Sequence, residues 1–259
     1  MLRPIIAGGT KVKRFDKYPF EAAIIEADSE TIYCGGVIIS SKFILTAAHC
    51  LTNDLIVKSR AKCQTWNMPK ECFRAPKTMR IGYINHPTQE IMHKKRVLRT
   101  IPHPYYNAVK ITNDIGLIEL VNPIVCLDLP RPICLPTRNF SKLGNELIIA
   151  GWGYSEEEAL NGQTVLTEGK VIQVPPTDCG YLMIPTERIL CARGMKSRQA
   201  SCQGDSGSGI FALRDFNYYV LGVTSIGPIE CGFEHPDAYT DVYAYMDWIK
   251  SIVKDIPTI

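Results

Sequence analysis

The sequence predicts an all-β fold that ends in a single α-helix. Three observations support this prediction. The apolar segments are at most about eleven residues long and are rich in Val, Ile, Leu and aromatic residues. Clusters of Gly, Pro, Asn and Asp separate these segments, and no amphipathic helices alternate with them. Many short strands of this kind are typical of sandwiches and barrels, in which closure removes exposed sheet edges.

The strand-like segments occur in both halves of the chain. In order, they cover residues 20–25, 33–39, 115–121, 147–152, 164–174 and 218–225. Turn-forming pairs such as Asn122-Pro123 and Asn161-Gly162 lie between them. Because no internal repeat, low-complexity tract or long linker interrupts the chain, we expect no division into independent domains.

The C-terminal segment has helical periodicity. Apolar residues recur at i, i+3 and i+4 spacing on one face, and polar residues occupy the other. The apolar face consists of Tyr245, Trp248, Ile249, Ile252 and Val253, and the polar face of Asp247, Lys250, Ser251 and Lys254. This pattern predicts an amphipathic helix over residues 243–254.

Composition excludes several classes of protein. The chain has 259 residues, of which 46% are hydrophobic and 21% charged, so wholesale disorder is not expected. No apolar run approaches the roughly 18 residues that cross a bilayer, and we predict no membrane partner. A net charge of +3 does not indicate a nucleic-acid partner.

The cysteines indicate the compartment. There are ten of them and none forms a Cys-x-x-Cys pair, so neither a zinc ribbon nor a thioredoxin motif is indicated. An even number spread along the chain favours disulfides and therefore a secreted, extracellular protein. Residues 1–4 contain no apolar signal segment, and we expect that such a segment has been removed.

Three separated segments hold the residue types that acyl transfer requires. They are Thr46-Ala47-Ala48-His49-Cys50, Asn113-Asp114-Ile115 and Gly204-Asp205-Ser206-Gly207. A serine hydroxyl becomes a good nucleophile only when a base takes its proton, and a histidine oriented by a buried carboxylate is such a base near neutral pH. Glycines beside the serine let backbone N–H groups converge on a developing oxyanion.

In the order His, Asp, Ser, these segments resemble the trypsin-like (chymotrypsin-fold) serine proteases. The resemblance extends over nearly the whole chain. It includes Cys34-Gly35-Gly36, Gly151-Trp152-Gly153, Ser225 and the terminal helix. It implies that His49 is the general base, Asp114 its orienting carboxylate and Ser206 the nucleophile, and that the N–H groups of Gly204 and Ser206 form the oxyanion hole.

The resemblance also implies the architecture. We expect two six-stranded antiparallel β-barrels, with the active site in the crevice between them. Barrel one should cover about residues 20–121 and barrel two about 134–242, followed by the helix at 243–254. Residues 1–5 would be a short prosegment, and residues 6–259 a single serine peptidase domain.

Three disulfides are implied by the resemblance: Cys34–Cys50, Cys179–Cys191 and Cys202–Cys231. Among the remaining four cysteines, short separations favour Cys63–Cys72 and Cys126–Cys134. In the alternative pairing, Cys134 bonds to another chain or to a propeptide segment, as many relatives do with a cysteine at this place.

Activation in the family frees an Ile or Val whose ammonium pairs with the Asp before the nucleophile. Ile6-Ala7-Gly8-Gly9 fits this pattern best, with Asp205 as the partner. The preceding Arg3-Pro4 is a poor site for a trypsin-like activator, and Ile5 is an alternative new terminus if one residue is inserted.

The substrate pocket departs from the family. Proteases that cut after Lys or Arg carry an Asp six residues before the nucleophile, where this chain has Ala200. Asp237 instead replaces a Gly on the pocket wall. It either reaches a basic side chain from that wall, or bonds only to Ser201, fills the pocket and admits smaller or apolar residues. Some partner is expected because a lone buried carboxylate is costly. Ser225–Gly227 should pair with extended substrate.

Other departures concern the surroundings of the site. Ser208-Gly209 stands where Gly-Pro is usual, and Ile226 replaces a usual Trp, which weakens discrimination at outer subsites. An insertion at about 58–77, with Cys63, Trp66 and Cys72, should overhang the cleft beside His49, or else be a surface excursion without substrate contact. Tyr83 replaces a calcium-binding carboxylate, so we predict no metal and no cofactor.

Two surface features complete the prediction. Asn139-Phe140-Ser141 is an N-glycosylation acceptor. His93-Lys94-Lys95-Arg96 with Arg99 is a basic run, either a solvated face or an exosite for acidic macromolecules.

The predicted protein is a monomeric zymogen of a secreted serine endopeptidase that accepts Lys or Arg and also apolar residues. Its partners would be protein or peptide substrates and protein inhibitors. The alternative is an inactive homologue that acts as a binding or regulatory protein.

Overall fold

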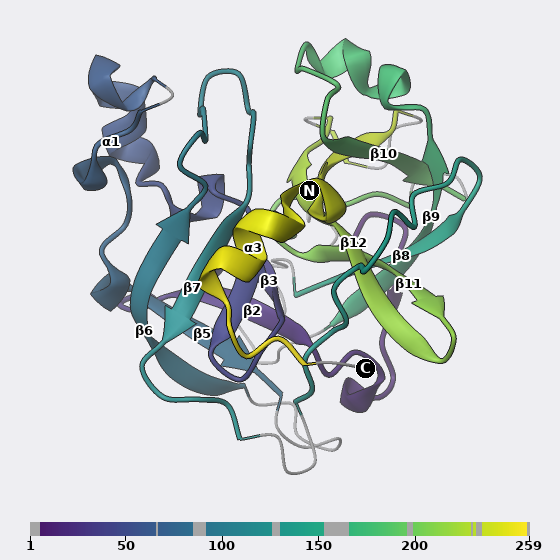
Figure 1. Cartoon of the computed structure of the whole chain (residues 1–259), viewed down its shortest axis with the longest axis horizontal. Helices are drawn as coiled ribbons and strands as arrows, with labels where there is room; N and C mark the ends of the chain where they lie inside the picture. The colour runs from purple at the N-terminus through teal and green to yellow at the C-terminus, as the bar shows by residue number, and fades with distance from the viewer. Residues whose placement is uncertain are drawn as a thin grey trace.

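The computed structural model describes residues 6–65, 67–84, 92–125, 130–152, 166–195, 199–228, 230–231 and 235–257. Ile5, Trp66, Cys126, Gly153 and the predicted turn at 161–162 lie outside the described residues. The strands form two closed antiparallel barrels that stand side by side (Figure 1). The fold class predicted from the sequence is therefore confirmed.

Barrel one closes in the order β2-β3-β4-β7-β6-β5. Its strands are β2 (Glu21–Glu26), β3 (Ile32–Ile38), β4 (Phe43–Thr46), β5 (Met79–Tyr83), β6 (His93–Pro102) and β7 (Gly116–Leu120). The basic run starts β6, where Arg96 pairs with Arg80 of β5. Because these charges lie on the outer surface, β6 lacked a clear apolar signal in the sequence.

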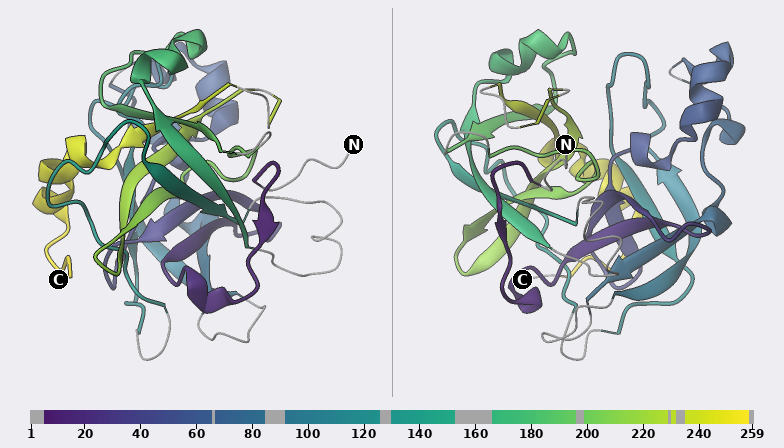
Figure 2. Two further views of the ribbon diagram at one scale, coloured as in Figure 1. Left: turned by 90° about the vertical axis from the view of Figure 1, so that its right-hand side faces the viewer. Right: turned by 180° about the vertical axis from the view of Figure 1, so that it is seen from behind.

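Barrel two follows the order β9-β10-β13-β12-β11-β8, with β8 paired back to β9. Its strands are β8 (Glu146–Gly151), β9 (Thr167–Val174), β10 (Ile189–Gly194), β11 (Gly209–Arg214), β12 (Asn217–Ile226) and β13 (Asp237–Asp241). The short strand β1 (Thr10–Lys11) adds to the outer side of β9. Figure 2 shows this purple N-terminal segment running along barrel two before the chain crosses to barrel one.

Helices are short in the described part of the chain. The two α-helices are α1 (Asp54–Ser59) and α3 (Met246–Ile252). The 3-10 helices are η1 (Phe15–Lys17), η2 (His49–Leu51), η3 (Ala61–Cys63), η4 (Lys70–Cys72), η5 (Pro76–Thr78), η6 (Pro176–Leu182) and η7 (Val242–Tyr245). The predicted terminal helix thus begins as a 3-10 turn, whose Tyr243 N–H is capped by Asp241. None of the described helices is long and apolar enough to cross a membrane.

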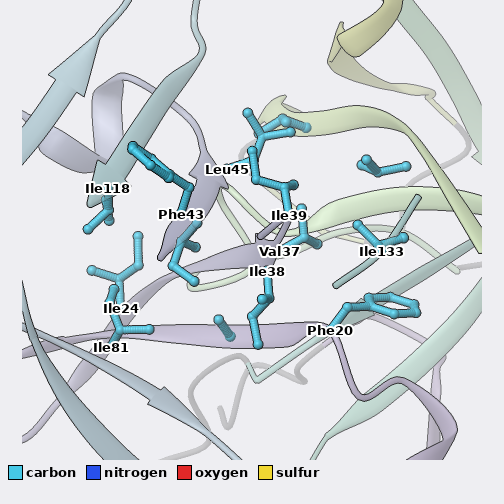
Figure 3. Packing of buried hydrophobic residues seen from close by; sticks show 14 of the residues in the cluster. Phe20, Ile24, Val37, Ile38, Ile39, Phe43, Leu45, Ile81, Ile118 and Ile133 are labelled. Carbon is cyan, nitrogen blue, oxygen red and sulfur yellow. The ribbon is translucent and has the colours of Figure 1, made fainter. Parts of the chain in front are cut away.

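An apolar core joins the barrels. Figure 3 shows part of this core, where Ile24 of β2 lies beside Ile81, its cross-strand partner in β5. Phe20 contacts Phe211 of barrel two with ring centroids 5.0 Å apart, in an edge-to-face arrangement that aromatic pairs favour. This packing fixes the orientation of the barrels, and with it the positions of loops that come from both.

Candidate active site

The histidine and the aspartate approach each other from two ends of barrel one. His49 begins η2, directly after β4, and Asp114 lies just before β7. His49 Nδ1 is 2.8 Å from Asp114 Oδ2, and the His49 backbone N–H donates to Oδ1 over 2.9 Å. The carboxylate therefore holds both the ring and the backbone of His49.

Two hydroxyl groups from barrel two support Asp114. Ser225 donates to Asp114 Oδ2 at 2.6 Å, and Thr240 donates to the Asp114 carbonyl oxygen at 2.7 Å. The neighbouring Asn113 has φ +53° and its side-chain oxygen accepts a bond from Tyr245 at the C-terminal end of η7. The sequence named Ser225 only as part of the substrate edge. It did not identify Thr240 or Tyr245, because nothing local to them indicates a contact with Asp114.

These contacts shift the pKa values of both His49 and Asp114. Burial alone would lower the pKa of His49, but the charge of Asp114 and its hydrogen bond outweigh burial and raise that pKa above its usual value. Burial alone would raise the pKa of Asp114, but the charge of His49 and the hydrogen bonds from His49 and Ser225 hold it below its usual value. The pair is therefore suited to stabilise a protonated imidazole beside an ionised carboxylate.

Ser206 stands in the turn before β11. Cys50 Sγ lies 3.7 Å from His49 Nε2 and 3.4 Å from the Ser206 carbonyl oxygen, so the disulfide at Cys50 contacts both segments. The Ser206 hydroxyl makes no hydrogen bond with any described residue. Catalytic hydrogen bonds are often long in proteins without substrate and shorten when substrate binds.

The turn around Ser206 requires glycine. Gly207 has φ +83°, and a Cβ there would lie 2.2 Å from Thr46 Oγ1 and 2.5 Å from the Gly35 carbonyl oxygen. Gly204 has φ +94°. In the described part of the chain, the backbone N–H groups of Gly204 and Ser206 have no acceptor. They are therefore available to an oxyanion.

Asp205 is buried behind this turn. Its Oδ2 accepts hydrogen bonds from the Ile6 backbone N at 3.1 Å and from the Cys202 N–H at 2.9 Å. The structure thus brings together Ile6 and Asp205, the two residues that the sequence assigned to activation.

The residues predicted to line the specificity pocket include Gly227, directly after β12, and Asp237, the first residue of β13. Asp237 is 2% exposed, and its Oδ2 accepts from the Ser201 N–H at 2.8 Å and from the Tyr239 hydroxyl at 3.4 Å. Its Oδ1 has no partner among the described residues, and it faces Gly227 so closely that a Cβ there would be 2.3 Å away. Burial raises the pKa of Asp237 to about 7. Ala200 is also buried, next to Ser201.

Comparison with known proteins places this arrangement in a family. The model of the trypsin family matches residues 6–249. The chain belongs to the trypsin family. It is 29% identical to melanization protease 1 of Drosophila melanogaster, covering 96% of this chain and 66% of that protein. It is 30% identical to phenoloxidase-activating factor 3 of Holotrichia diomphalia, covering 92% and 70%.

A vertebrate relative is also similar. Vitamin K-dependent protein C of Rattus norvegicus is 29% identical over 97% of this chain and 52% of its own length. The chain thus spans between about half and about two-thirds of the length of these relatives. The similarity covers the trypsin-family portion of the chain.

The disulfides of this trypsin-family chain agree with most of the expected pairs. The structure contains Cys34–Cys50, Cys63–Cys72, Cys179–Cys191 and Cys202–Cys231. Cys134 is a free thiol among the described cysteines, so the expected Cys126–Cys134 pairing stays a prediction. The Cys134 backbone N–H donates to the Tyr218 carbonyl oxygen, and its carbonyl oxygen accepts from the Val220 N–H in β12. Cys126 itself lies outside the described residues.

The insertion predicted at about 58–77 begins within α1, a short way along the chain after His49. The Thr52 hydroxyl donates to the His49 carbonyl oxygen at 2.7 Å, and the Asn53 N–H donates to the Cys72 carbonyl oxygen at 2.9 Å. The Cys63–Cys72 disulfide closes the loop beyond α1, whose Leu55 is 81% exposed. The segment directly after His49 therefore contacts Cys72 and Arg74 of the insertion, and α1 projects from barrel one in Figure 1.

Proposed function

We propose that this chain is the peptidase domain of a secreted serine endopeptidase that works through an acyl-enzyme. The observation that carries the proposal is the half-buried His49 paired with the buried Asp114, next to a serine turn whose Gly204 and Ser206 N–H groups lack acceptors among the described residues. The expectation of secretion rests on the four disulfides, which persist in oxidising compartments.

In this mechanism Ser206 Oγ attacks the scissile carbonyl carbon while His49 Nε2 takes the hydroxyl proton. The carbonyl oxygen becomes an oxyanion that the N–H groups of Gly204 and Ser206 stabilise. His49 then gives its proton to the leaving amine, the C–N bond breaks, and an ester to Ser206 remains. His49 then takes a proton from water as the water oxygen attacks the ester carbonyl carbon, and it returns this proton to Ser206 Oγ as the C–O bond breaks and the acid product leaves. Asp114 stays ionised throughout and stabilises the imidazolium.

The pocket supports a mixed primary specificity. Asp237 Oδ2 is bound by Ser201, whereas Oδ1 has no partner among the described residues and can accept from a Lys or Arg side chain. A charge-assisted hydrogen bond of this kind contributes roughly 1.5–3 kcal/mol, or about ten- to hundredfold in preference. Since Ala200 offers no charge, we propose that apolar side chains are accepted as well.

The proposal also predicts the substrates and inhibitors of the chain and one covalent modification, a glycan. Substrates would be proteins or peptides that pair as an added strand with Ser225–Gly227, and protein inhibitors would bind the same cleft. Asn139 is exposed, and the Ser141 N–H donates to its side-chain oxygen at 2.8 Å. We propose that Asn139 carries a glycan and that the chain acts as a monomer without metal or cofactor.

Labelling with a fluorophosphonate tests the proposal. The activated protein should be labelled at Ser206 within minutes, and Ser206→Ala should abolish the label while circular dichroism stays unchanged. The alternative function, a binding protein with an occluded cleft, is favoured by the close approach of Asp237 to Gly227. Folded, activated protein that neither labels nor cleaves any peptide of a random library would support that alternative and refute the enzyme.

A further inference from the structure

The leaving side of the scissile bond is located by His49. In the proposed mechanism His49 Nε2 gives its proton to the leaving amine, so the substrate residues that follow the scissile bond pass this atom. Cys50 Sγ lies 3.7 Å from His49 Nε2, and Cys50 is bonded to Cys34. The Cys34–Cys50 disulfide therefore borders the leaving side, whereas Asp237 belongs to the pocket for the acyl side.

Asp54 is held close to His49 by the chain that follows this disulfide. The Thr52 hydroxyl lies 2.7 Å from the His49 carbonyl oxygen and 3.3 Å from Asp54 Oδ1, so it connects the two residues. The Asn53 side chain accepts from the Ile56 N–H at the start of α1, whose first residue is Asp54. Asp54 is exposed, and its carboxylate is therefore accessible from outside.

The charge of Asp54 reaches groups on two separate segments of the active site. Burial lowers the pKa of His49, the charge and the hydrogen bond of Asp114 raise it, and the charge of Asp54 raises it further. Burial raises the pKa of Tyr106, and the charges of Asp114 and Asp54 add to this effect. Because His49 follows β4 and Tyr106 follows β6, Asp54 acts on the space between the segments that carry them.

No cation in the described part of the chain forms an ion pair with Asp54. Arg74 has other partners, since it donates to the Thr52 carbonyl oxygen at 3.0 Å and pairs with Glu26. Lys58 lies one turn further along α1 and does not pair with Asp54 either. The carboxylate of Asp54 is therefore available to a cation supplied by a substrate.

We propose that Asp54 binds a Lys or Arg side chain of the substrate on the leaving side of the scissile bond. This inference rests on the proposed function, since it adds a second specificity site to the same cleft. Side chains of an extended substrate alternate in direction, so only one of the first two residues after the scissile bond faces Asp54. Asp54 determines specificity and takes no part in proton transfer.

The preference is modest because Asp54 is exposed. Water and salt weaken an ion pair between exposed side chains, which limits the gain in kcat/KM to about two- to fivefold for a basic residue over an uncharged one. An acidic residue at the same position is disfavoured by a similar factor. The preferred substrates therefore carry a basic residue after the scissile bond, in addition to the acyl-side residue that Asp237 selects.

The experiment uses the activated protein of the labelling test and a set of peptides with Leu on the acyl side, which keeps the charge of Asp237 out of the comparison. The first and the second residue after the scissile bond are each varied among Lys, Gln and Glu, and kcat/KM is measured. We expect Lys to exceed Gln by about two- to fivefold at one of the two positions in about 0.05 M salt. This preference should shrink in about 0.5 M salt, where the Debye length is shorter.

Asp54→Asn and Asp54→Lys are the test variants, and Asp247→Asn is the matched control. Asp247 is also an exposed acidic residue in the first turn of an α-helix, α3, so its substitution removes the same kind of helix stabilisation. The Lys preference should disappear in Asp54→Asn, reverse toward Glu in Asp54→Lys and persist in Asp247→Asn. If Asp54→Lys does not fold, the neutral variant still decides, because it keeps the size of the side chain.

A wild type without a Lys preference, or a preference that survives in Asp54→Asn, would overturn the inference. The proposed catalysis would then stand, because the Leu peptides are still cleaved and Ser206 is still labelled. A preference that Asp247→Asn loses as well would also overturn the inference, since the effect would not depend on the position of Asp54. Folded protein that neither labels at Ser206 nor cleaves any of these peptides would overturn the proposed function, and this inference with it.

Discussion

Asp237 should make the specificity of the enzyme depend on pH. Burial raises the pKa of the Asp237 carboxyl to about 7. Asp237 is therefore ionised in about a tenth of the protein molecules at pH 6 and in about nine-tenths of them at pH 8. Only the ionised form attracts a Lys or Arg side chain strongly. The ratio of kcat/KM for a basic substrate to kcat/KM for an apolar substrate should therefore rise about ninefold between pH 6 and pH 8.

The ratio is the quantity to measure because His49 must also lose its proton, and that titration affects both substrates equally. Two peptides that differ only in the residue on the acyl side, Lys against Leu, are assayed at equal enzyme concentration from pH 5.5 to 8.5. The kcat/KM profile reports the free enzyme, so the midpoint of the ratio should lie near the pKa of Asp237.

The matched control is Asp237→Asn. It keeps the size of the side chain and an oxygen that can accept from the Ser201 N–H, but it cannot ionise. Its ratio should be flat across the pH range and about ten- to hundredfold below that of the wild type at pH 8, the worth of one charge-assisted hydrogen bond. A flat ratio in the wild type, or an equal loss of activity toward both peptides in the variant, would show that Asp237 is structural.

Three further outcomes are expected. The raised pKa of His49 should place the acid limb of kcat/KM for an apolar substrate above pH 6.5, and Asp114→Asn should lower kcat by about 10⁴; a limb at lower pH would contradict the paired geometry. Gly207→Ala should destabilise the protein by about 2 kcal/mol or more in urea unfolding, because its Cβ meets Thr46 Oγ1; an unchanged midpoint would refute this. Glu21 is buried without a partner among the described residues, and burial, followed by the charge of Asp205, holds its pKa well above the usual value. A raised carboxyl pKa means that stability falls as pH rises from the unfolded value toward the folded one. Glu21→Gln should therefore raise Tm more at pH 8 than at pH 4.5, and an equal rise at both would argue that Glu21 is not the titrating group.

The sequence by itself determined the features that neighbouring residues encode. Short apolar segments between turn residues predicted the all-β class, and i, i+3, i+4 spacing predicted the terminal helix. The His49, Asp114 and Ser206 motifs, with Cys34 and Cys50, were sufficient to recognise the family. The sequence did not predict β6, because many of its side chains are charged and face outward. A strand of an antiparallel sheet needs apolar side chains on only one face, so its apolar pattern is weak.

The tertiary structure decided everything that depends on residues far apart in the chain. Ser225 and Asp114 are 111 positions apart, and Ile6 and Asp205 are 199 apart. No local pattern specifies such contacts, because they arise only when both barrels close and pack through their shared core. The same closure placed the Ile6 nitrogen at Asp205 and enclosed Asp237, so that burial raises the pKa of this carboxyl to about 7.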